Sequence, residues 1–258
     1  MIFWSDMQTL IKAINKLANH DIDEARELFR MLIKDKIDIS AAYAGLAIIN
    51  IHKKNAALAK NELALSDDTK IITPLNYIAH GLIASSEGKL DEALELLNSA
   101  IKIDPNLYFI YQVIGSTLLT NTKDYNESVL FLKKAKELGG DNWAIHWNLA
   151  VAYNNLGKAY SAFQEATLSY LSKPTKDGLK FIYANAPILI RTLILIVFLT
   201  GLSGIFIFPA TTTGVAATVT TLLIAELIRY IFTNNRSSLI LISLYLTLAT
   251  VYYLVFVR

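Results

Sequence analysis

The chain has 258 residues, with 24 Lys and Arg against 22 Asp and Glu, so its formal net charge is only +2. The surplus of basic residues lies beyond residue 180, which leaves the preceding part close to neutral and gives little support for non-specific nucleic-acid binding. The sequence contains no cysteine, which excludes disulfides, thiolate metal sites and cysteine nucleophiles.

The N-terminal segment and two weakly marked helix pairs come first in the chain. The opening residues, Met1-Ile-Phe-Trp-Ser-Asp-Met, show no basic segment followed by an apolar core, so we expect no secretory signal. Small and apolar residues at helical spacing predict a degenerate helix pair from about Asp6 and a second pair from about Asp38 to Ile71. The marker residues are Ala13, His20, Ala25, Phe29 and Leu32 in the first pair, and Ala41, Gly45, Ile48, Ala57 and Ala64 in the second.

Residues 74–105 carry the clearest helix pair. Small side chains at Gly81 and Ala93 allow two antiparallel helices to approach closely, and Pro105 ends the second helix. The marker positions are Tyr77, Gly81, Ala84, Gly88, Ala93, Leu97, Ala100 and Pro105.

Two further pairs follow. The pair from Tyr108 to about Asn142 has one extra residue near Asn121, and the pair from Trp143 to Lys176 has His146 where an aromatic residue is usual. The small residues that mark the second helix of each pair are Ala25, Ala57, Ala93, Ser128 and Ala162, at intervals of 32, 36, 35 and 34 residues. A period of this length indicates a solenoid of helix pairs.

On these residues, the repeated unit resembles the tetratricopeptide repeat (TPR). The resemblance covers about residues 6–176 and implies an all-α helix-turn-helix solenoid over residues 1–176, with about five repeats, of which the first is degenerate. Because members of this family bind peptides or helices of other proteins, the resemblance implies a protein-binding scaffold without a cofactor rather than an enzyme.

In this family the first helices of the repeats line a concave groove. Transferred to this chain, the groove positions are Leu46, Ile49, Asn50, Leu75, Ile78, Leu82, Ser85, Phe109, Gln112, Ser116, Leu119, Trp147, Val151, Asn154 and Asn155. Such a groove is apolar with a rim of amides, and it lacks the Lys, Arg and Asn set by which some members clamp a C-terminal carboxylate. It suits an amphipathic helix or an extended apolar peptide. The alternative is that the chain fills part of the groove itself, for instance with the segment Ile2-Phe3-Trp4.

Phe109 and Trp147 offer large rigid apolar area at groove positions of adjacent repeats. If they are exposed, they are anchors for a partner. If they are buried, they are core residues whose truncation lowers stability. The sequence leaves both alternatives open.

Residues 177–187 are expected to form a capping or juxtamembrane linker. Leu179, Ile182 and Tyr183 either seal the last repeat, which we favour, or lie in the headgroup layer of a membrane. Pro187 suits the first position of a following helix.

Three apolar runs fill the remainder of the chain, at residues 188–208, 215–232 and 239–257. As helices they would extend roughly 27 to 32 Å, enough to cross a hydrocarbon core about 30 Å thick, so we predict a three-helix membrane domain over residues 188–258. Lys173, Lys176, Lys180 and Arg191 lie near the start of the first run. The excess of positive charge on the inner side therefore predicts a cytoplasmic repeat arm and a C-terminus across the membrane.

Glu226 and Arg229 are ionisable residues within the second apolar run. Three residues apart on a helix, they can pair; they either line a polar path or form a snorkelling ion pair near the inner interface, which we favour. Gly201, Gly204 and Gly214 belong to small-residue faces, which predict close packing against other membrane subunits.

Catalytic and metal-binding patterns are not found in the sequence. His20, His52, His80 and His146 show no metal-ligand spacing and are interpreted as structural residues of the repeats. We therefore predict a membrane-anchored scaffold that recruits a cytoplasmic protein partner to a membrane complex. The alternatives are an accessory or regulatory subunit of a transport or secretion machine, with Glu226 and Arg229 on its polar path, and a receptor whose spans serve only as an anchor.

Overall fold

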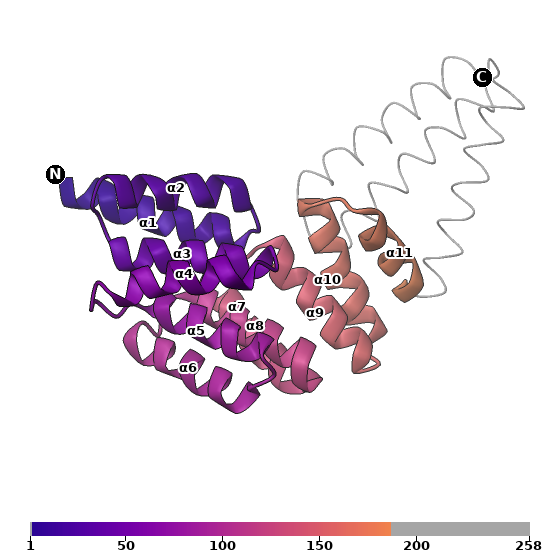
Figure 1. Ribbon diagram of the computed structural model, residues 1–258. Helices are drawn as coiled ribbons and strands as arrows, with labels where there is room; N and C mark the ends of the chain where they lie inside the picture. The colour runs from indigo at the N-terminus through magenta and orange to yellow at the C-terminus, as the bar shows by residue number, and fades with distance from the viewer. Residues whose placement is uncertain (1, 187–258) are drawn as a thin grey trace, which may run out of the picture. The chain divides into compact units, whose positions relative to one another are not determined.

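Five antiparallel helix pairs follow one another along the N-terminal part of the chain (Figure 1). The computed structural model describes residues 2–186, with side chains described for residues 7–182 and 184–186. The helices of the pairs are α1 (Ile2–Ala18), α2 (Ile22–Lys34), α3 (Ile39–His52), α4 (Ala56–Asp67), α5 (Pro74–Ser86), α6 (Leu90–Ile103), α7 (Tyr108–Thr117) with the π-helical turn η1 (Leu118–Thr122), α8 (Tyr125–Glu137), α9 (Trp143–Asn155) and α10 (Ala159–Ser172). For the described residues, the predicted all-α solenoid is confirmed.

The chain divides into two compact units, Met1–Pro174 and Thr175–Arg258. The first unit is the repeat array. Of the second, the structure describes residues 175–186, which contain α11 (Lys176–Asn185). The hydroxyl of Thr175 caps this helix by accepting a hydrogen bond from the Gly178 N–H at 3.0 Å. A helix therefore occupies most of the segment that we expected to be a linker.

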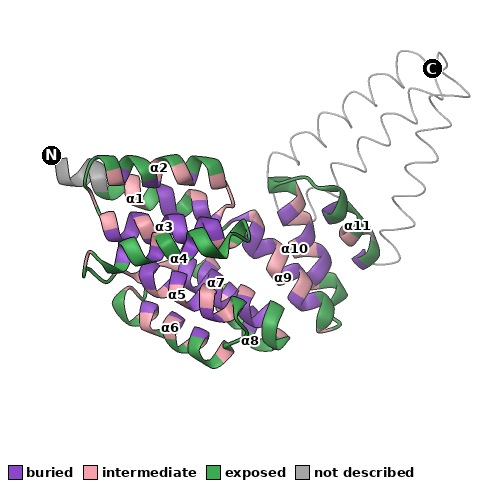
Figure 2. Ribbon diagram, in the orientation of Figure 1, coloured by how far each residue is buried: buried purple, intermediate pink, exposed green. Residues whose placement is uncertain are grey.

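Small buried residues bring the two helices of each pair close together. The second helices show largely exposed surface in Figure 2, and their small residues are among the buried ones. These residues, each 0% exposed, are Ala25, Ala59, Ala93, Ser128 and Ala162. On the facing helices, a Cβ added to Gly81 would lie 3.0 Å from Leu97 Cγ, and one added to Gly115 would lie 2.6 Å from Leu132 Cγ. The pairs are thus packed to the limit that their smallest side chains allow.

The predicted register of the second repeat was wrong by two residues. Ala57 and Ala64 are exposed, whereas Ala59, Leu63 and Ser66 are buried. The small residues of successive repeats are therefore 34, 34, 35 and 34 residues apart. The pattern was ambiguous because α4, with the sequence AALAKNELALSD, has Ala or Leu on several faces. Its true inner face is decided by contact with α3.

The interval of 35 residues contains the π-helical turn η1, at Leu118–Thr122. A π turn accommodates one more residue than an α turn, which accounts for the extra residue predicted near Asn121. The side chain of Asn121 donates a hydrogen bond from Nδ2 to Ser85 Oγ at 2.6 Å, so this turn also ties the fourth repeat to the third.

Each helix pair turns through one residue with left-handed backbone geometry. These residues are His20, Lys54, Gly88, Lys123 and Gly157, with φ between 56° and 79°. Glycine adopts this geometry freely, whereas an L side chain there costs roughly 1 to 2 kcal/mol. In the first pair the turn fixes the His20 ring beyond the end of α1, where it meets later repeats.

Gly45 provides a test of the packing between repeats. A Cβ at Gly45 would lie 2.4 to 2.6 Å from three ring atoms of Phe29, which is fully buried. We expect Gly45→Ala to lower the free energy of unfolding by about 1 to 3 kcal/mol in denaturant titrations, because a rigid ring must move. Gly81→Ala is the matched control; its nearest neighbour is the branched, flexible Leu97, and the gain in helix propensity of roughly 1 kcal/mol should offset the tighter contact. Equal destabilisation by both changes would contradict this account.

Candidate interaction surface

The end of α1 meets the fourth and fifth repeats, 93 to 124 residues later in the sequence. Three side-chain donors on α7 and α9 bond to it: Tyr108 Oη donates to Asn15 Oδ1 at 3.0 Å, Gln112 Nε2 to the Ala18 carbonyl at 2.9 Å, and Trp143 Nε1 to the Asn19 carbonyl at 2.8 Å. The array therefore winds tightly enough for its first repeat to contact its last two.

Two of these acceptors are carbonyl groups that helix geometry leaves without a partner. The last carbonyls of a helix have no intrahelical N–H to accept from. The turn after α1 satisfies the carbonyls of Lys16 and Leu17 with backbone N–H groups. The carbonyls of Ala18 and Asn19 accept from side chains of α7 and α9 instead. Later repeats thus cap the end of the first helix.

Gln112 and Asn142 extend this contact into the protein. Asn142 Nδ2 donates to Gln112 Oε1 at 3.0 Å, while Asn142 Oδ1 accepts from the N–H groups of Ala144 and Ile145, each at 3.0 Å. Both amide side chains are buried, so their polar groups need partners. The chain of bonds fixes the start of α9 against α7 and, through Gln112, against the end of α1.

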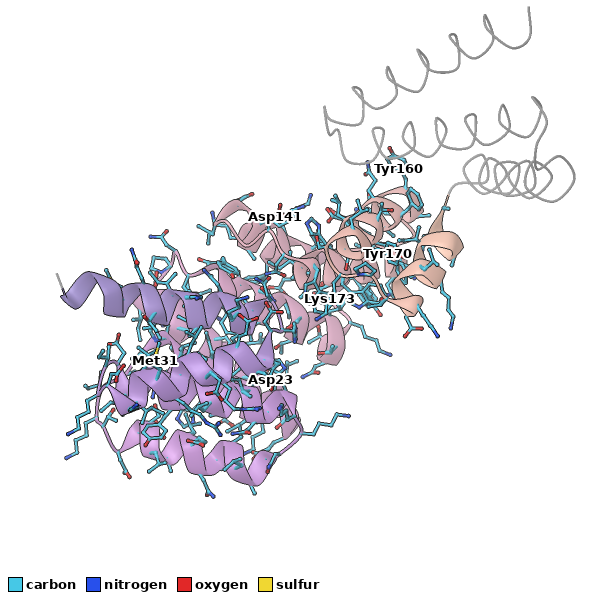
Figure 3. All side chains as sticks on the ribbon, turned by 90° about the horizontal axis from the view of Figure 1, so that it is seen from above. Asp23, Met31, Asp141, Tyr160, Tyr170 and Lys173 are labelled. Atoms are coloured by element: carbon cyan, nitrogen blue, oxygen red, sulfur yellow. The ribbon has the colours of Figure 1, made fainter. Side chains whose placement is uncertain are left out.

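Two histidines and a tryptophan gather beside these bonds. The ring centroids of His20 and His52 are 5.2 Å apart, and those of His20 and Trp143 are 5.4 Å apart. Lys173, labelled in Figure 3, follows α10, and its ammonium lies 4.3 Å from the centroid of the Trp143 ring. We call His20, His52, Trp143 and Lys173 the ring cluster; it joins the first, second and fifth repeats.

The ring cluster disfavours positive charge on its histidines. Desolvation by burial, followed by the neighbouring His52 and Lys173, lowers the pKa of His20 from 6.5 to about 4. Surrounding protein atoms also desolvate His52 and lower its pKa, although part of its side chain remains exposed. Both rings are therefore neutral near pH 7 and are available for ring contacts.

The first helices of four repeats form a closed ring of contacts. α1 contacts α3, α3 contacts α5, α5 contacts α7, and α7 contacts α1. Side chains that would line an open groove are instead turned toward one another. The predicted groove positions that the structure buries are Leu46, Ile49, Asn50, Leu75, Ile78, Phe109, Gln112 and Leu119. The expectation of an open apolar groove along α3, α5 and α7 was therefore wrong.

In the second repeat, the shift of register adds to this correction. With the frame moved by two residues, Leu46 and Ile49 no longer hold groove positions, and Asn50 takes the place that Ala84 has in the third repeat. The alternative in which the chain covers its own groove matches what is observed for α1. The residues involved are at the end of α1, however, and the side chains of Ile2-Phe3-Trp4 lie outside the described ones.

The accessible positions of the predicted groove lie mainly on α9, with further half-buried positions on α5 and, at Ser116, on α7. Leu82, Trp147 and Val151 are half-buried, and Asn154 and Asn155 are exposed. An apolar strip with exposed amides at its edge can cover an apolar side chain of a partner and satisfy polar groups at the rim. We call the four residues on α9, namely Trp147, Val151, Asn154 and Asn155, the α9 surface.

A second apolar surface lies in the loop between α4 and α5. Ile71 and Ile72 are 64% and 65% exposed there. They border a depression of about 390 Å³ whose other lining residues are Asp67, Lys70, Asn76, Tyr77 and His80. His80 Nε2 lies 3.1 Å from a carboxylate oxygen of Asp67, so the rim of this depression is polar.

His146 stands in the slot where the second, third and fourth repeats have a tyrosine. Its Nδ1 lies 2.5 Å from Glu165 Oε2 and its Nε2 lies 2.8 Å from Asp141 Oδ1. Burial would raise the pKa of Glu165, but the hydrogen bond with His146 and the charge of Lys136 outweigh it and lower that pKa. These groups join α8, α9 and α10. Among the described residues, no group of three or more His, Asp or Glu side chains is arranged to hold a metal ion.

The sequence reasoning missed the residues that close the array. No local pattern predicts that a group of residues from different repeats meets here, namely Asn15, Tyr108, Asn142 and Trp143. Their contacts join repeats that are separate in the sequence. The one local signal was Asn142 before α9, a residue type that favours helix N-caps. It could have placed the start of α9 but not its contact with α7.

The predicted membrane spans belong to a part of the chain other than the described helices. Within residues 2–186, no helix has both the length and the apolar character that a membrane span requires. The three predicted spans, together with Glu226 and Arg229, lie outside this range.

Comparison with known proteins identifies the repeat. Residues 76–107 match the model of the family described as tetratricopeptide repeat. The third helix pair therefore has the sequence of a tetratricopeptide repeat, and the other pairs share its spacing of small buried residues. This match falls on the helix pair α5 and α6, which the sequence marked most clearly.

Other known chains are similar to this one in sequence or in fold at low identity. The peroxisomal targeting signal receptor of Saccharomyces cerevisiae is 26% identical over 118 residues, which make up 46% of this chain and 18% of that receptor. A chain of the APC/C hetero-tetramer Cut9–Hcn1 has a TM-score of 0.50 and 18% identity, covering 84% of this chain and 42% of that one. Pseudomonas aeruginosa pilF has a TM-score of 0.51 and 14% identity, covering 83% of this chain and 97% of that one. At such identities, the likeness to solved structures shows the fold alone.

The lowered pKa of His20 predicts acid sensitivity. Because the unfolded chain takes up a proton near pH 6.5 and the folded chain only near pH 4, stability falls as the pH drops between these values. The loss from this residue is on the order of 2 to 3 kcal/mol once complete. His20→Asn, which tolerates the left-handed backbone, should show a smaller loss in urea titrations from pH 7.5 to 4. Lys36→Asn, at a φ of 59°, is the control and should follow the wild type. Superimposable pH profiles for all three proteins would refute the role of His20.

Phe109 is 2% exposed and is therefore a core residue rather than a binding anchor. We expect Phe109→Ala to cost about 3 to 5 kcal/mol of stability and to lower the melting temperature sharply. Leu130→Ala, at a side chain that is 67% exposed, should leave the melting temperature close to that of the wild type. A Phe109→Ala protein that melts like the wild type would contradict the core assignment.

Proposed function

We propose that this TPR protein is a membrane-anchored adaptor that binds a protein partner on the α9 surface. The observation that supports this site is the contrast between repeats: the concave positions of α3, α5 and α7 are mostly covered, while those of α9 stay accessible. Trp147 and Val151 supply apolar area, and Asn154 and Asn155 supply amides at its edge. A surface of this kind suits the apolar side of a partner helix or an extended apolar peptide.

The comparisons support a binding role rather than catalysis. A TPR array is a frame of stacked helix pairs, and its functions reside in the surfaces that it presents. The three apolar runs at residues 188–208, 215–232 and 239–257 would hold this array at a bilayer, with the repeats in the cytoplasm and the C-terminus on the opposite side. Small-residue faces in the runs would recruit other membrane subunits.

A pull-down in mild detergent tests the adaptor. The full-length chain should co-purify with a reproducible partner set, identified by mass spectrometry. Trp147→Ala should weaken partner binding by roughly 2 kcal/mol, about a thirtyfold loss of affinity, because large aromatic side chains dominate interface energies. When Asn154→Ala and Asn155→Ala are added to Trp147→Ala, partner binding should weaken further. The two added changes should leave the melting temperature unchanged.

The depression beside α5 supplies the matched control. Ile71→Ser with Ile72→Ser removes two exposed apolar side chains elsewhere on the array, and it should leave the partner set intact. If this control loses the partners while the α9 variants keep them, the binding surface lies in the α4–α5 loop and our assignment to α9 is wrong.

The proposed orientation can be tested with single cysteines, because the chain has none of its own. With the repeats in the cytoplasm, the link between the first two runs faces the other side and the link between the second and third faces the cytoplasm. A membrane-impermeant maleimide should label Thr212→Cys in intact cells and should label Ser237→Cys and Lys53→Cys only after lysis. Labelling of Lys53→Cys in intact cells would overturn the orientation.

A further inference from the structure

The end of α1 occupies a site that is built to receive a helix. Ile14, Leu17 and Ala18 of α1 are buried, with 8%, 1% and 1% of their surfaces exposed. Gln112 and Trp143 donate hydrogen bonds to carbonyls at the helix end that have no partner within the helix. Tyr108 donates to the side-chain oxygen of Asn15, one turn earlier. Apolar side chains and end carbonyls are therefore bound at the same place.

The carbonyl bonds do not depend on the side chains of the bound helix. Every α-helix ends in carbonyl groups without intrahelical partners, so the donors Gln112 and Trp143 recognise a feature that any helix offers. The site then selects among helices through its apolar contacts. At the positions of Leu17 and Ala18, the bound helix must have a large apolar side chain followed by a small one. These requirements describe the helix that the site accepts.

We propose that Tyr108, Gln112 and Trp143 form a helix-end docking site, which α1 fills in the closed array and which an apolar helix of the partner fills when the first repeat moves away. This inference rests on the proposed adaptor function; of the two kinds of partner considered there, a helix or an extended peptide, it selects the helix and adds a second site to the α9 surface. The partner helix needs an apolar stripe that includes a small residue in its last turn, and its C-terminal end must reach Gln112 and Trp143.

The array can release α1 without unfolding as a whole. In a solenoid, each repeat draws its stability from its own packing and from its neighbours, so the second to fifth repeats keep their packing on one another when the first repeat moves away. Opening exposes apolar side chains of the ring of first helices, so an open state is disfavoured until another apolar helix covers them. The closed state is thus a competitor that the partner helix must displace.

A peptide with the sequence of residues 7–21, carrying a fluorophore at its N-terminus, serves as the probe. Binding is measured by fluorescence anisotropy with the full chain in mild detergent. Wild-type protein should bind weakly, because its own α1 fills the site. Asn15→Ala with His20→Asn removes the bond to Tyr108 and the ring contacts of His20 on the α1 side alone, and it should bind the probe at least tenfold more tightly. Lys12→Ala, at an exposed position of α1, is the control and should bind as the wild type does.

A reversible crosslink tests the docking site by holding α1 in place instead of weakening its contacts. The chain has no cysteine, so Asn15→Cys with Tyr108→Cys gives one pair that a short methanethiosulfonate crosslinker can join. The crosslinked protein should bind the probe at least tenfold more weakly than the same protein after reduction. Each protein is compared with itself, so this result holds even if the other variant unfolds its first repeat.

Two outcomes would overturn the docking site. One is equal probe binding before and after reduction of the crosslink. The other is a folded Asn15→Ala/His20→Asn protein, with the helical circular dichroism of the wild type, that binds the probe no more tightly than Lys12→Ala. The probe assay uses no cellular partner, so it is independent of the pull-down. A pull-down in which the α9 variants keep their partners rejects the adaptor surface. The two probe outcomes above reject the helix-end site.

Discussion

Close approach of antiparallel helices at small residues is the constraint on which the rest of the structure depends. With Ala25, Ala59, Ala93, Ser128 and Ala162 fully buried, each second helix lies so near its partner that side chains such as Leu97 and Leu132 interlock across it. Every helix pair then has nearly the same shape, and identical pairs stack with a constant rotation. A small change in this rotation, repeated at each of the four junctions between pairs, decides whether the array stays open or closes on itself.

In this chain the rotation brings the first repeat onto the fourth and fifth. An open TPR groove is apolar because it awaits a partner, whereas here the same apolar side chains form the interior of a ring of first helices. The distinction is one of winding rather than of composition: Ile78 and Phe109 would suit either a groove or a core. A polar group decides the matter, since the buried Gln112 finds an acceptor for its Nε2 on Ala18 of α1 when the ring is closed.

The sequence predicts what depends on local spacing and fails where distant repeats meet. The period, the helix pairs and the extra residue at η1 follow from small residues about 34 positions apart and from turn residues such as Gly88 and Gly157. The register of α4 was misread because alanine and leucine lie on several of its faces. Trp143 shows no special pattern in the sequence, since its hydrogen-bond acceptor is the Asn19 carbonyl in the turn after α1, 124 residues earlier. Winding is the sum of many small packing angles, which a spacing pattern does not encode.

Closure places two demands on whatever covers the ring of first helices. Apolar area must be buried, and the donors of Gln112 and Trp143 must each find an acceptor, because a buried polar group without a partner costs about 1 to 3 kcal/mol. An apolar segment without a helix end buries apolar area but offers no acceptor to the two donors. A polar peptide offers acceptors but buries too little apolar area. The end of α1 meets both with two backbone carbonyls and a short apolar stripe. Selectivity for a helix therefore arises from the combination, and neither the apolar interior nor the donor pair would provide it alone.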